Sequence, residues 1–470
     1  MELKHSNPTV QPGDPYMNCH TGRKSVGQTL TEIINSTEFG CTISITGEWG
    51  TGKTTFLRMW EQDLKDKKYP TVLLNAWETE WAEDPLIAVV ACIYRACKTD
   101  SSNIIESINT ILNAFVKRPL PMLGAAIKTM TEAKFGTNLS DISGELNSVS
   151  FDKEVESFNK RESAIVELKS SLEKLAWDVN QGSDQPKPLV FIIDELDRCK
   201  PDYAVRLLEV LKHFFEVKNI VFVCAIDKKH LEDSIRGFYG CEGLNATEYL
   251  RRFFDLEIEL PTPDYEKFCA HLYDYYKLGD FFESEERVRC GFRDNGEEFK
   301  RFLASLAVKS HLTLRQIERI CAFTKMSLRK TNPRTYYFPT LSLFVTYLRF
   351  FNYSFYLELK SHTMTAQAVL DRIVKEYGNL IDSKPDYSNK TNNHRIMLFM
   401  LAKLVVSYVN DRTFEREPIY DTEKKSTTLT CSIFTKEELN EAIGWASGGH
   451  DDYELSWLFS VLEILKIDSH

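Results

Sequence analysis

The sequence contains no C-x-x-C pair, no long run of purely apolar residues and no excess of basic side chains. Its 11 cysteines are scattered and odd in number, which argues against a disulfide framework or a cysteine metal site. We therefore expect reduced thiols in a cytoplasmic protein. The balance of 58 Lys and Arg against 68 Asp and Glu gives a net charge of −10. This charge argues against a general polyanion binder, although a local basic groove could exist within it.

A membrane span is also missing from the pattern. The longest apolar tract, residues 338–359, contains Arg349, Asn352 and Glu358, which a bilayer core would penalise by several kcal/mol together. We interpret this tract as a buried helix of a soluble domain. The first residues are polar and interrupted by prolines, so we expect no secretory signal.

The length of 470 residues exceeds what one hydrophobic core usually serves, so two or three domains are expected. We predict an amino-terminal arm over residues 1–24 and a phosphate-loop NTPase domain over 25–263, with a mostly helical insert at 101–184. A helical lid over 264–335 and a carboxyl-terminal helical domain over 336–470 complete the prediction.

Short apolar runs alternate with helical patterns through the predicted NTPase domain. The runs cover residues 41–46, 71–75, 189–193, 220–226 and 255–260. Strands that are apolar without alternation are typical of parallel sheets covered on both faces. The pattern predicts a doubly wound α/β fold, whose ligands bind at the carboxyl ends of the strands.

A glycine-rich turn between the first of these runs and a helical segment fits the pattern G-x-x-x-x-G-K-[ST]. Its residues are Gly47, Glu48, Trp49, Gly50, Thr51, Gly52, Lys53 and Thr54, with Thr55 as a further nucleotide-binding candidate. Such a loop points backbone N–H groups at phosphates, near the positive end of a helix dipole. We expect Lys53 to reach the terminal phosphates and Thr54 to offer its hydroxyl to Mg²⁺. The alternative is an ordinary glycine turn.

Two acids, Asp194 and Glu195, follow the apolar run 189–193. Asp194 can hold Mg²⁺ through its water shell, and Glu195 can orient and polarise an attacking water. The simpler interpretation is that acids end strands because loops are wet. In a chain with a phosphate loop, we favour water-activating ATP hydrolysis.

Several nearby side chains have two interpretations. Asp197 could support the metal site or pair with Arg198. Asp227 could sense the γ-phosphate or cap the helix that follows it. Trp49 and Trp77 could shape the site by stacking, although such tryptophans more often belong to a core.

Three arginines are candidates to offset charge during phosphoryl transfer. Arg251 and Arg252 precede the last predicted strand and could reach a nucleotide in their own or a neighbouring subunit. Arg315 opens a helix for which Thr313 is the expected N-cap, and it could close over the nucleotide. For all three, exposed helix positions are the alternative. The basic run at 325–334 could bind nucleic acid, but a solvated face is the more common explanation.

Five groups of residues make the chain resemble the KAP family of P-loop NTPases. They lie at 47–57, at 75–78 with 84–90, at 192–199, at 225–235 and at 249–263. The resemblance implies an additional-strand sheet related to the AAA+ and STAND classes that binds ATP with Mg²⁺. In it, Lys53 and Thr54 match the phosphate and metal residues, and Asp194 matches the Walker B acid.

The chain departs from this family at a few positions. Glu195 stands where many relatives have Asp, and Arg252 where they often have Lys. Many members carry transmembrane helices in the region of 101–184, and none is evident here. Bacterial members are often linked to phage exclusion beside partner proteins, which makes antiviral defence an expectation.

We therefore expect an ATPase whose cycle moves the helical domains against the sheet domain, acting as a homo-oligomer or with a protein partner. One alternative is a nucleotide-gated oligomeric scaffold that hydrolyses slowly. Another is a nucleic-acid-stimulated ATPase.

Overall fold

The computed structural model describes residues 9–37, 40–82, 85–96, 166, 169–178, 187–212, 217–329, 331–334, 337–380, 393–411, 419–448 and 455–464. The chain forms two compact units. The sheet unit comprises Asn7–Cys19 and Arg23–Thr262, and the helical unit comprises Met1–Ser6, His20–Gly22 and Pro263–His470. Most of the predicted insert at 101–184 lies outside the described residues.

The sheet unit contains a five-stranded parallel sheet, ordered β2-β3-β4-β1-β5. Its strands are β1 (Cys41–Thr46), β2 (Thr71–Asn75), β3 (Leu189–Asp194), β4 (Ile220–Ile226) and β5 (Leu256–Glu259). Every residue of β1, β3 and β4 is buried, as expected for strands covered on both faces. The predicted α/β fold is confirmed.

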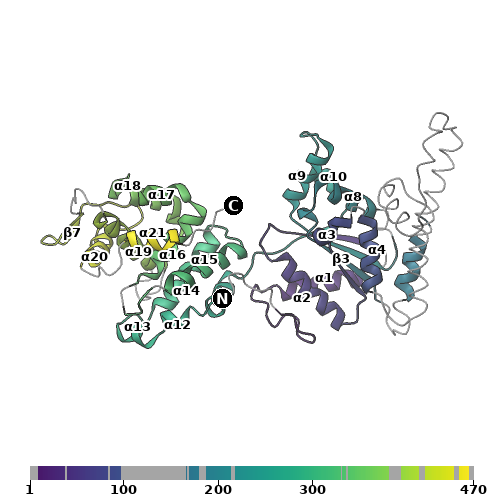
Figure 1. The fold of residues 1–470 in the computed structure, drawn as a ribbon, viewed down its shortest axis with the longest axis horizontal. Coiled ribbons are helices and arrows are strands. Elements are labelled where there is room, and N and C mark those ends of the chain that lie inside the picture. The colour runs from purple at the N-terminus through teal and green to yellow at the C-terminus, as the bar shows by residue number, and fades with distance from the viewer. Residues whose placement is uncertain are drawn as a thin grey trace. The chain divides into compact units, whose positions relative to one another are not determined.

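Helices cover both faces of this sheet (Figure 1). They are α1 (Lys24–Ser36), α2 (Lys53–Asp66), α3 (Ala76–Thr79), α4 (Pro85–Ala96), α8 (Pro201–Lys212), α9 (Lys228–Tyr239) and α10 (Ala246–Leu250). Successive residues of β3 join different cores: Phe191 packs with residues of α4 and α8, whereas Ile192 packs with residues of α1 and α2. This alternation follows from the two-residue period of a strand.

The helical unit is built on an aromatic-rich core. Its helices are α11 (Tyr265–Tyr275), α12 (Gly279–Phe282), α13 (Glu285–Arg289), α14 (Asn295–Lys309), α15 (Leu314–Leu328), α16 (Pro339–Phe351), α17 (Tyr353–Lys360), α18 (Ala366–Tyr377), α19 (Asn393–Asn410), α20 (Lys436–Ser447) and α21 (Leu455–Ile464). A hairpin of β6 (Tyr420–Asp421) and β7 (Ser426–Thr427) precedes α20.

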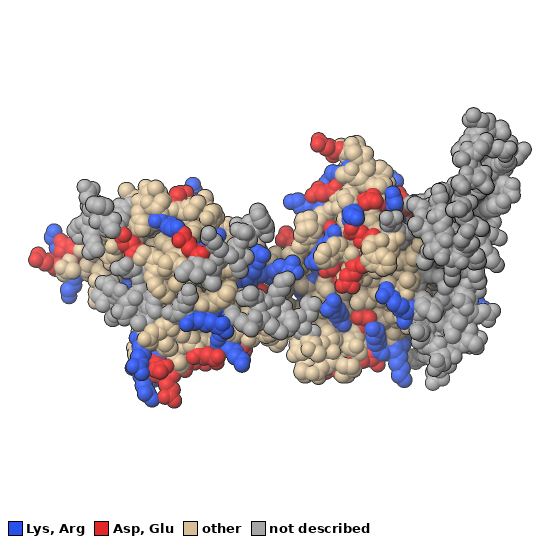
Figure 2. Space-filling model, in the orientation of Figure 1, with Lys and Arg blue, Asp and Glu red and all other residues tan. Residues whose placement is uncertain are grey.

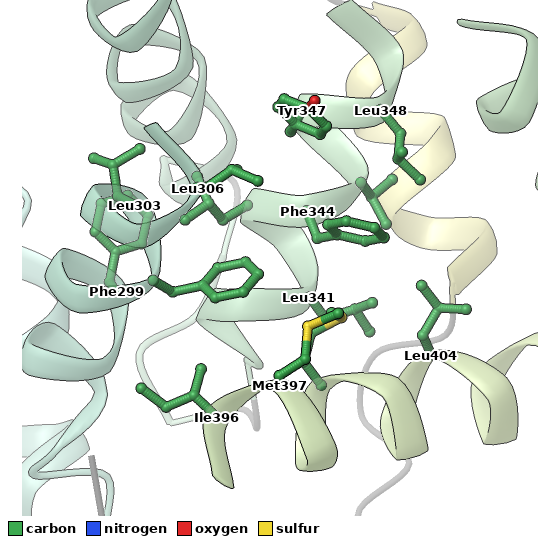
Figure 3. Packing of buried hydrophobic residues seen from close by; sticks show 14 of the residues in the cluster. Phe299, Leu303, Leu306, Leu341, Phe344, Tyr347, Leu348, Ile396, Met397 and Leu404 are labelled. Carbon is green, nitrogen blue, oxygen red and sulfur yellow. The ribbon is translucent and has the colours of Figure 1, made fainter. Parts of the chain in front are cut away.

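One core connects the two parts that were predicted as separate lid and carboxyl-terminal domains. Phe299 of α14, Phe344 of α16 and Met397 of α19 belong to the same buried cluster (Figure 3). Residues on both sides of the expected boundary at 335 therefore pack in one continuous core.

The apolar tract at 338–359 is two helices, α16 and α17, rather than the single buried helix expected. Asn352 separates them, with φ of −142°, and its side chain accepts a hydrogen bond from the Phe355 N–H at the start of α17. An asparagine that caps a new helix in this way competes with continuation of the previous one. Among the described residues, no helix is long and apolar enough to cross a membrane.

Candidate nucleotide-binding site

The phosphate loop joins the end of β1 to the start of α2, as the sequence predicts. Gly50 and Gly52 have φ of 81° and 89°, a left-handed conformation that glycine adopts without a steric penalty. At Gly47, an added Cβ would lie 3.1 Å from the Thr51 hydroxyl oxygen. A side chain at any of these three positions would be strained or crowded. Glycine therefore lets the loop present its backbone N–H groups to a ligand.

Lys53 is the first residue of α2, and its side chain folds back across the loop. Its ammonium group lies 2.6 Å from the Gly47 carbonyl oxygen and 3.2 Å from that of Glu48. Burial lowers the Lys53 pKa, while Asp197 and Asp227 act in the opposite direction. The two acceptors of its hydrogen bonds are neutral backbone carbonyls, so charged phosphate oxygens would be stronger hydrogen-bond partners.

Thr54 and Asp194 are the two expected magnesium ligands. The Thr54 side chain acts to lower the pKa of Asp194, and the Asp194 carboxylate accepts the Glu195 N–H at 2.9 Å. Burial is the main cause that raises the Asp194 pKa to about 6, and Glu195 and Asp197 raise it further. A hydroxyl and a buried carboxylate are hard oxygen donors, so this pair fits Mg²⁺.

No group of three His, Cys, Asp or Glu side chains that could hold a metal exists in the described parts of the chain. Thr55, the remaining loop candidate, lies in the first turn of α2.

Glu195, the predicted water-activating residue, adopts a left-handed backbone conformation with φ of 61°. Non-glycine residues with this φ are uncommon and gather at functional sites. One carboxylate oxygen accepts the Asn75 amide at 3.1 Å, and the other pairs with Arg198 at 2.6 Å. Asn75 is the last residue of β2 and is in register with Asp194 of β3, so neighbouring strand ends bring these groups together.

Trp49 links the phosphate loop to both acid-bearing strand ends. Its backbone N–H donates to Asp227 at 3.0 Å, and its indole N–H donates to Asp197. Its ring stacks on His230 with centroids 3.7 Å apart. The loop, the turn after β3 and the start of α9 are thus joined through one side chain.

Both tryptophans at this edge are partly exposed rather than in the core. Trp49 is 42% exposed and Trp77 is 54% exposed. A hollow of about 540 Å³ beside them is lined by Trp49, Trp77, Asp197, Arg198, Cys199, Pro201, His230, Asp233 and Ser234. The interpretation that they belong to a core is wrong, because both side chains are exposed and line this hollow.

Asp227 caps α9, since its side chain accepts the His230 N–H. The capping interpretation is therefore confirmed. The same carboxylate also holds the Trp49 N–H, so a role in sensing the nucleotide stays a prediction.

The structure does not bring Arg251 and Arg252 to the phosphate loop of their own chain. Asp255 donates its N–H to the Thr42 carbonyl, and β5 runs parallel to β1, so residues before β5 lie where the strands begin. The loop lies at the opposite edge, where they end. Arg251 pairs instead with Glu248 at 3.1 Å. Only the role toward a neighbouring subunit's nucleotide is left as a prediction.

Arg315 belongs to the helical unit. It follows Thr313, which caps α15 in a capping box with Gln316, as expected. Its proposed closure over the nucleotide stays a prediction.

Sequence analysis missed two residues at this site. Asn75 had a signal, because it begins one of the family-like segments at the end of a predicted strand. Arg23 had none, since a lone arginine in a lead-in segment resembles any surface cation. Yet Arg23 is 2% exposed and donates to the Thr51 carbonyl oxygen at 2.6 Å.

The parallel sheet, the loop and the strand-end acids define a P-loop nucleotide-binding fold. A model described as the KAP family P-loop domain matches residues 23–330. The chain belongs to the KAP family of P-loop NTPases.

Solved structures show only distant likeness. One is the ORC2 protein of Aeropyrum pernix in ADPNP and ADP complexes, with 12% identity over 66% of this chain and a TM-score of 0.34; the match spans 63% of that protein. Another is Drosophila ORC bound to DNA, with 11% identity, coverage of 97% of this chain and 98% of that one, and a TM-score of 0.38. No curated protein matches the chain. Likeness at this level carries no argument about function.

Proposed function

We propose that the protein binds ATP with Mg²⁺ and hydrolyses it. The observation that carries this proposal is that Trp49 joins the phosphate loop to the strand-end acids, because its backbone N–H donates to Asp227 at 3.0 Å and its indole N–H donates to Asp197. Lys53 and Thr54 belong to that loop, and Asp194 and Glu195 lie close to Asp197 in sequence. Membership of the KAP family of P-loop NTPases supports the same assignment.

Each residue has a defined task in this proposal. The loop N–H groups and Lys53 bind the phosphates of ATP, while Thr54 and Asp194 hold the metal ion. When bound, Mg²⁺ supplies positive charge that offsets charge developing on the phosphates. Glu195 orients a water and accepts its proton.

Equilibrium binding of a fluorescent ATP analogue in the presence of Mg²⁺ tests the first half of the proposal. Lys53→Ala should abolish binding. Lys65→Ala is the matched control, because Lys65 lies on the same helix with its side chain 48% exposed, and it should bind like the parent. Equal binding by Lys53→Ala and the parent would exclude this loop as the nucleotide site.

A nucleotide-gated scaffold with slow hydrolysis is the second candidate, and one observation favours it. Asn75 and Arg198 each engage one carboxylate oxygen of Glu195, so in this conformation a water must share the base with two donors. Sizing the protein with and without a non-hydrolysable ATP analogue separates the candidates. A nucleotide-dependent oligomer with negligible turnover favours the scaffold.

We further propose that nucleotide state changes the arrangement or assembly of the helical unit, in a cytoplasmic homo-oligomer or with a protein partner. The family resemblance extends this to antiviral defence. Stimulation by nucleic acid has less support. Lys325 of the basic run donates to the Lys277 carbonyl, and on the face drawn in Figure 2 basic and acidic side chains are interspersed. Stimulation that weakens with salt would favour it.

A further inference from the structure

Arg23 is a buried cation that donates a hydrogen bond to a backbone carbonyl of the phosphate loop. It immediately precedes α1 and is 2% exposed. Its Nη1 donates to the Thr51 carbonyl oxygen at 2.6 Å. Its Nε and Nη2 donate to the Pro261 carbonyl oxygen at 3.1 and 2.7 Å. One guanidinium group therefore joins the loop to the segment that follows β5.

The contact with Thr51 restrains the Thr51–Gly52 peptide, whose N–H belongs to the loop proposed to bind phosphate. The Thr51 carbonyl and the Gly52 N–H belong to one planar peptide unit and point to opposite sides of it. Holding the carbonyl therefore sets the direction of the Gly52 N–H. Gly52, with φ of 89°, has an unusually free backbone, so this peptide gains more from an external restraint than most.

The contact with Pro261 lies at the end of the sheet unit. Leu260 donates its N–H to the Thr46 carbonyl at 2.8 Å, so the chain after β5 stays beside the end of β1. Thr262 is the last residue of the sheet unit. On the other side of the boundary, Asp264 donates its N–H to the Thr21 carbonyl at 3.2 Å.

We propose that Arg23 is a positioning residue, which orients the Thr51–Gly52 peptide for phosphate and transmits nucleotide occupancy of the loop to residues 260–264. The inference rests on the proposed binding of ATP. A hydrogen bond from a charged donor to a carbonyl is among the stronger polar contacts in a protein. Occupancy that moves the Thr51 carbonyl must therefore move Arg23 or break its bond.

The test compares Arg23→Met, Arg23→Lys and the control Arg58→Met, which changes an exposed arginine of α2. ATP affinity is measured for each folded variant. Hydrogen exchange within residues 260–264 is then measured at the amides of Leu260, Thr262 and Asp264, because proline has no N–H, with and without saturating ATP and Mg²⁺. We expect Arg23→Met to weaken ATP binding about tenfold or more and to abolish the ATP-dependent change in exchange. Arg23→Lys should recover part of both, and Arg58→Met should match the parent.

A role in folding alone would lower the melting temperature of Arg23→Met but leave both readouts intact. Retention of either parental affinity or the exchange response by folded Arg23→Met overturns the inference and leaves ATP binding standing. Failure of the parent to bind ATP overturns both. If Arg23→Met does not fold, the parent decides: joint protection of the loop and residues 260–264 by ATP supports the inference, and protection of the loop alone overturns it.

Discussion

Both units bury charged side chains, but the cluster at the strand ends of the sheet unit differs from the buried arginine of the helical unit. In the helical unit, Arg287 is fully buried and donates to the Pro333 and Tyr337 carbonyls, between the rings of Phe281 and Phe292. In the sheet unit, Lys53, Asp194, Asp197 and Asp227 are buried together at the ends of the strands, where acids raise the pKa of Asp194.

This difference distinguishes Arg287, whose partners are in place, from the cluster of acids, which we propose binds a metal ion. A buried cation surrounded by carbonyls and aromatic faces has its partners already and holds the chain in place. Buried acids beside other acids are costly until a cation arrives, and such clusters mark functional sites. We therefore expect removal of the Arg287 charge to destabilise the helical unit, and removal of the Asp194 charge to stabilise the sheet unit.

The largest effect is expected at Arg287. Arg287→Ala should lower the free energy of unfolding of the helical unit by about 3 kcal/mol or more, because it leaves a cavity and unsatisfied carbonyls. Denaturant unfolding measures this loss, and ATP binding by the sheet unit should persist. Arg289→Ala is the control, since that side chain is 78% exposed. Equal stability of the two variants would contradict a structural role for Arg287.

Asp194 should behave in the opposite way. Its folded pKa of about 6 lies above its ordinary value of 3.8, so its contribution to stability is fully present below pH 4 and is lost as pH rises through 6. Without nucleotide, Asp194→Asn should therefore be more stable than the parent at pH 8, by up to about 3 kcal/mol. Thermal unfolding between pH 4 and 8 measures the difference. A less stable Asp194→Asn at pH 8 would show that the ionised carboxylate already has adequate partners.

Magnesium should reverse that order. Holding Mg²⁺ requires ionised Asp194, so stabilisation of the parent by ATP and Mg²⁺ should weaken as pH falls below about 6. Asp194→Asn should lose most of it at every pH. A melting-temperature series with ATP, with and without EDTA, checks this.

The smallest effect is expected at Asn75. Asn75→Ser keeps a residue that can cap α3 but removes the amide that holds Glu195. Because a hydrogen bond to a charged group contributes about 1.5 kcal/mol, turnover at saturating ATP should rise about tenfold. Steady-state phosphate release measures it. A fall in turnover would mean that Asn75 orients Glu195 for reaction rather than restraining it.

How far the sequence predicts this molecule depends on how local each feature is. The strands follow from unalternating apolar runs, and the phosphate loop follows from glycines at fixed spacing. The hydrogen bond from Asn75 to Glu195 depends on β2 and β3 lying side by side, although the two residues are 120 positions apart in the sequence. The edge at which Arg252 lies depends on β5 pairing in parallel with β1. Pairing between strands that are distant in the sequence cannot be inferred from the spacing of residues within each strand.

The central claim is that the ends of the strands bind ATP and activate a water through Glu195. Phosphate release from ATP and Mg²⁺ by the parent and by Glu195→Gln, with ATP affinity measured for both, tests it most directly. We predict that Glu195→Gln binds ATP like the parent and releases phosphate about 10²- to 10⁴-fold more slowly. Equal rates for the two proteins would contradict the claim.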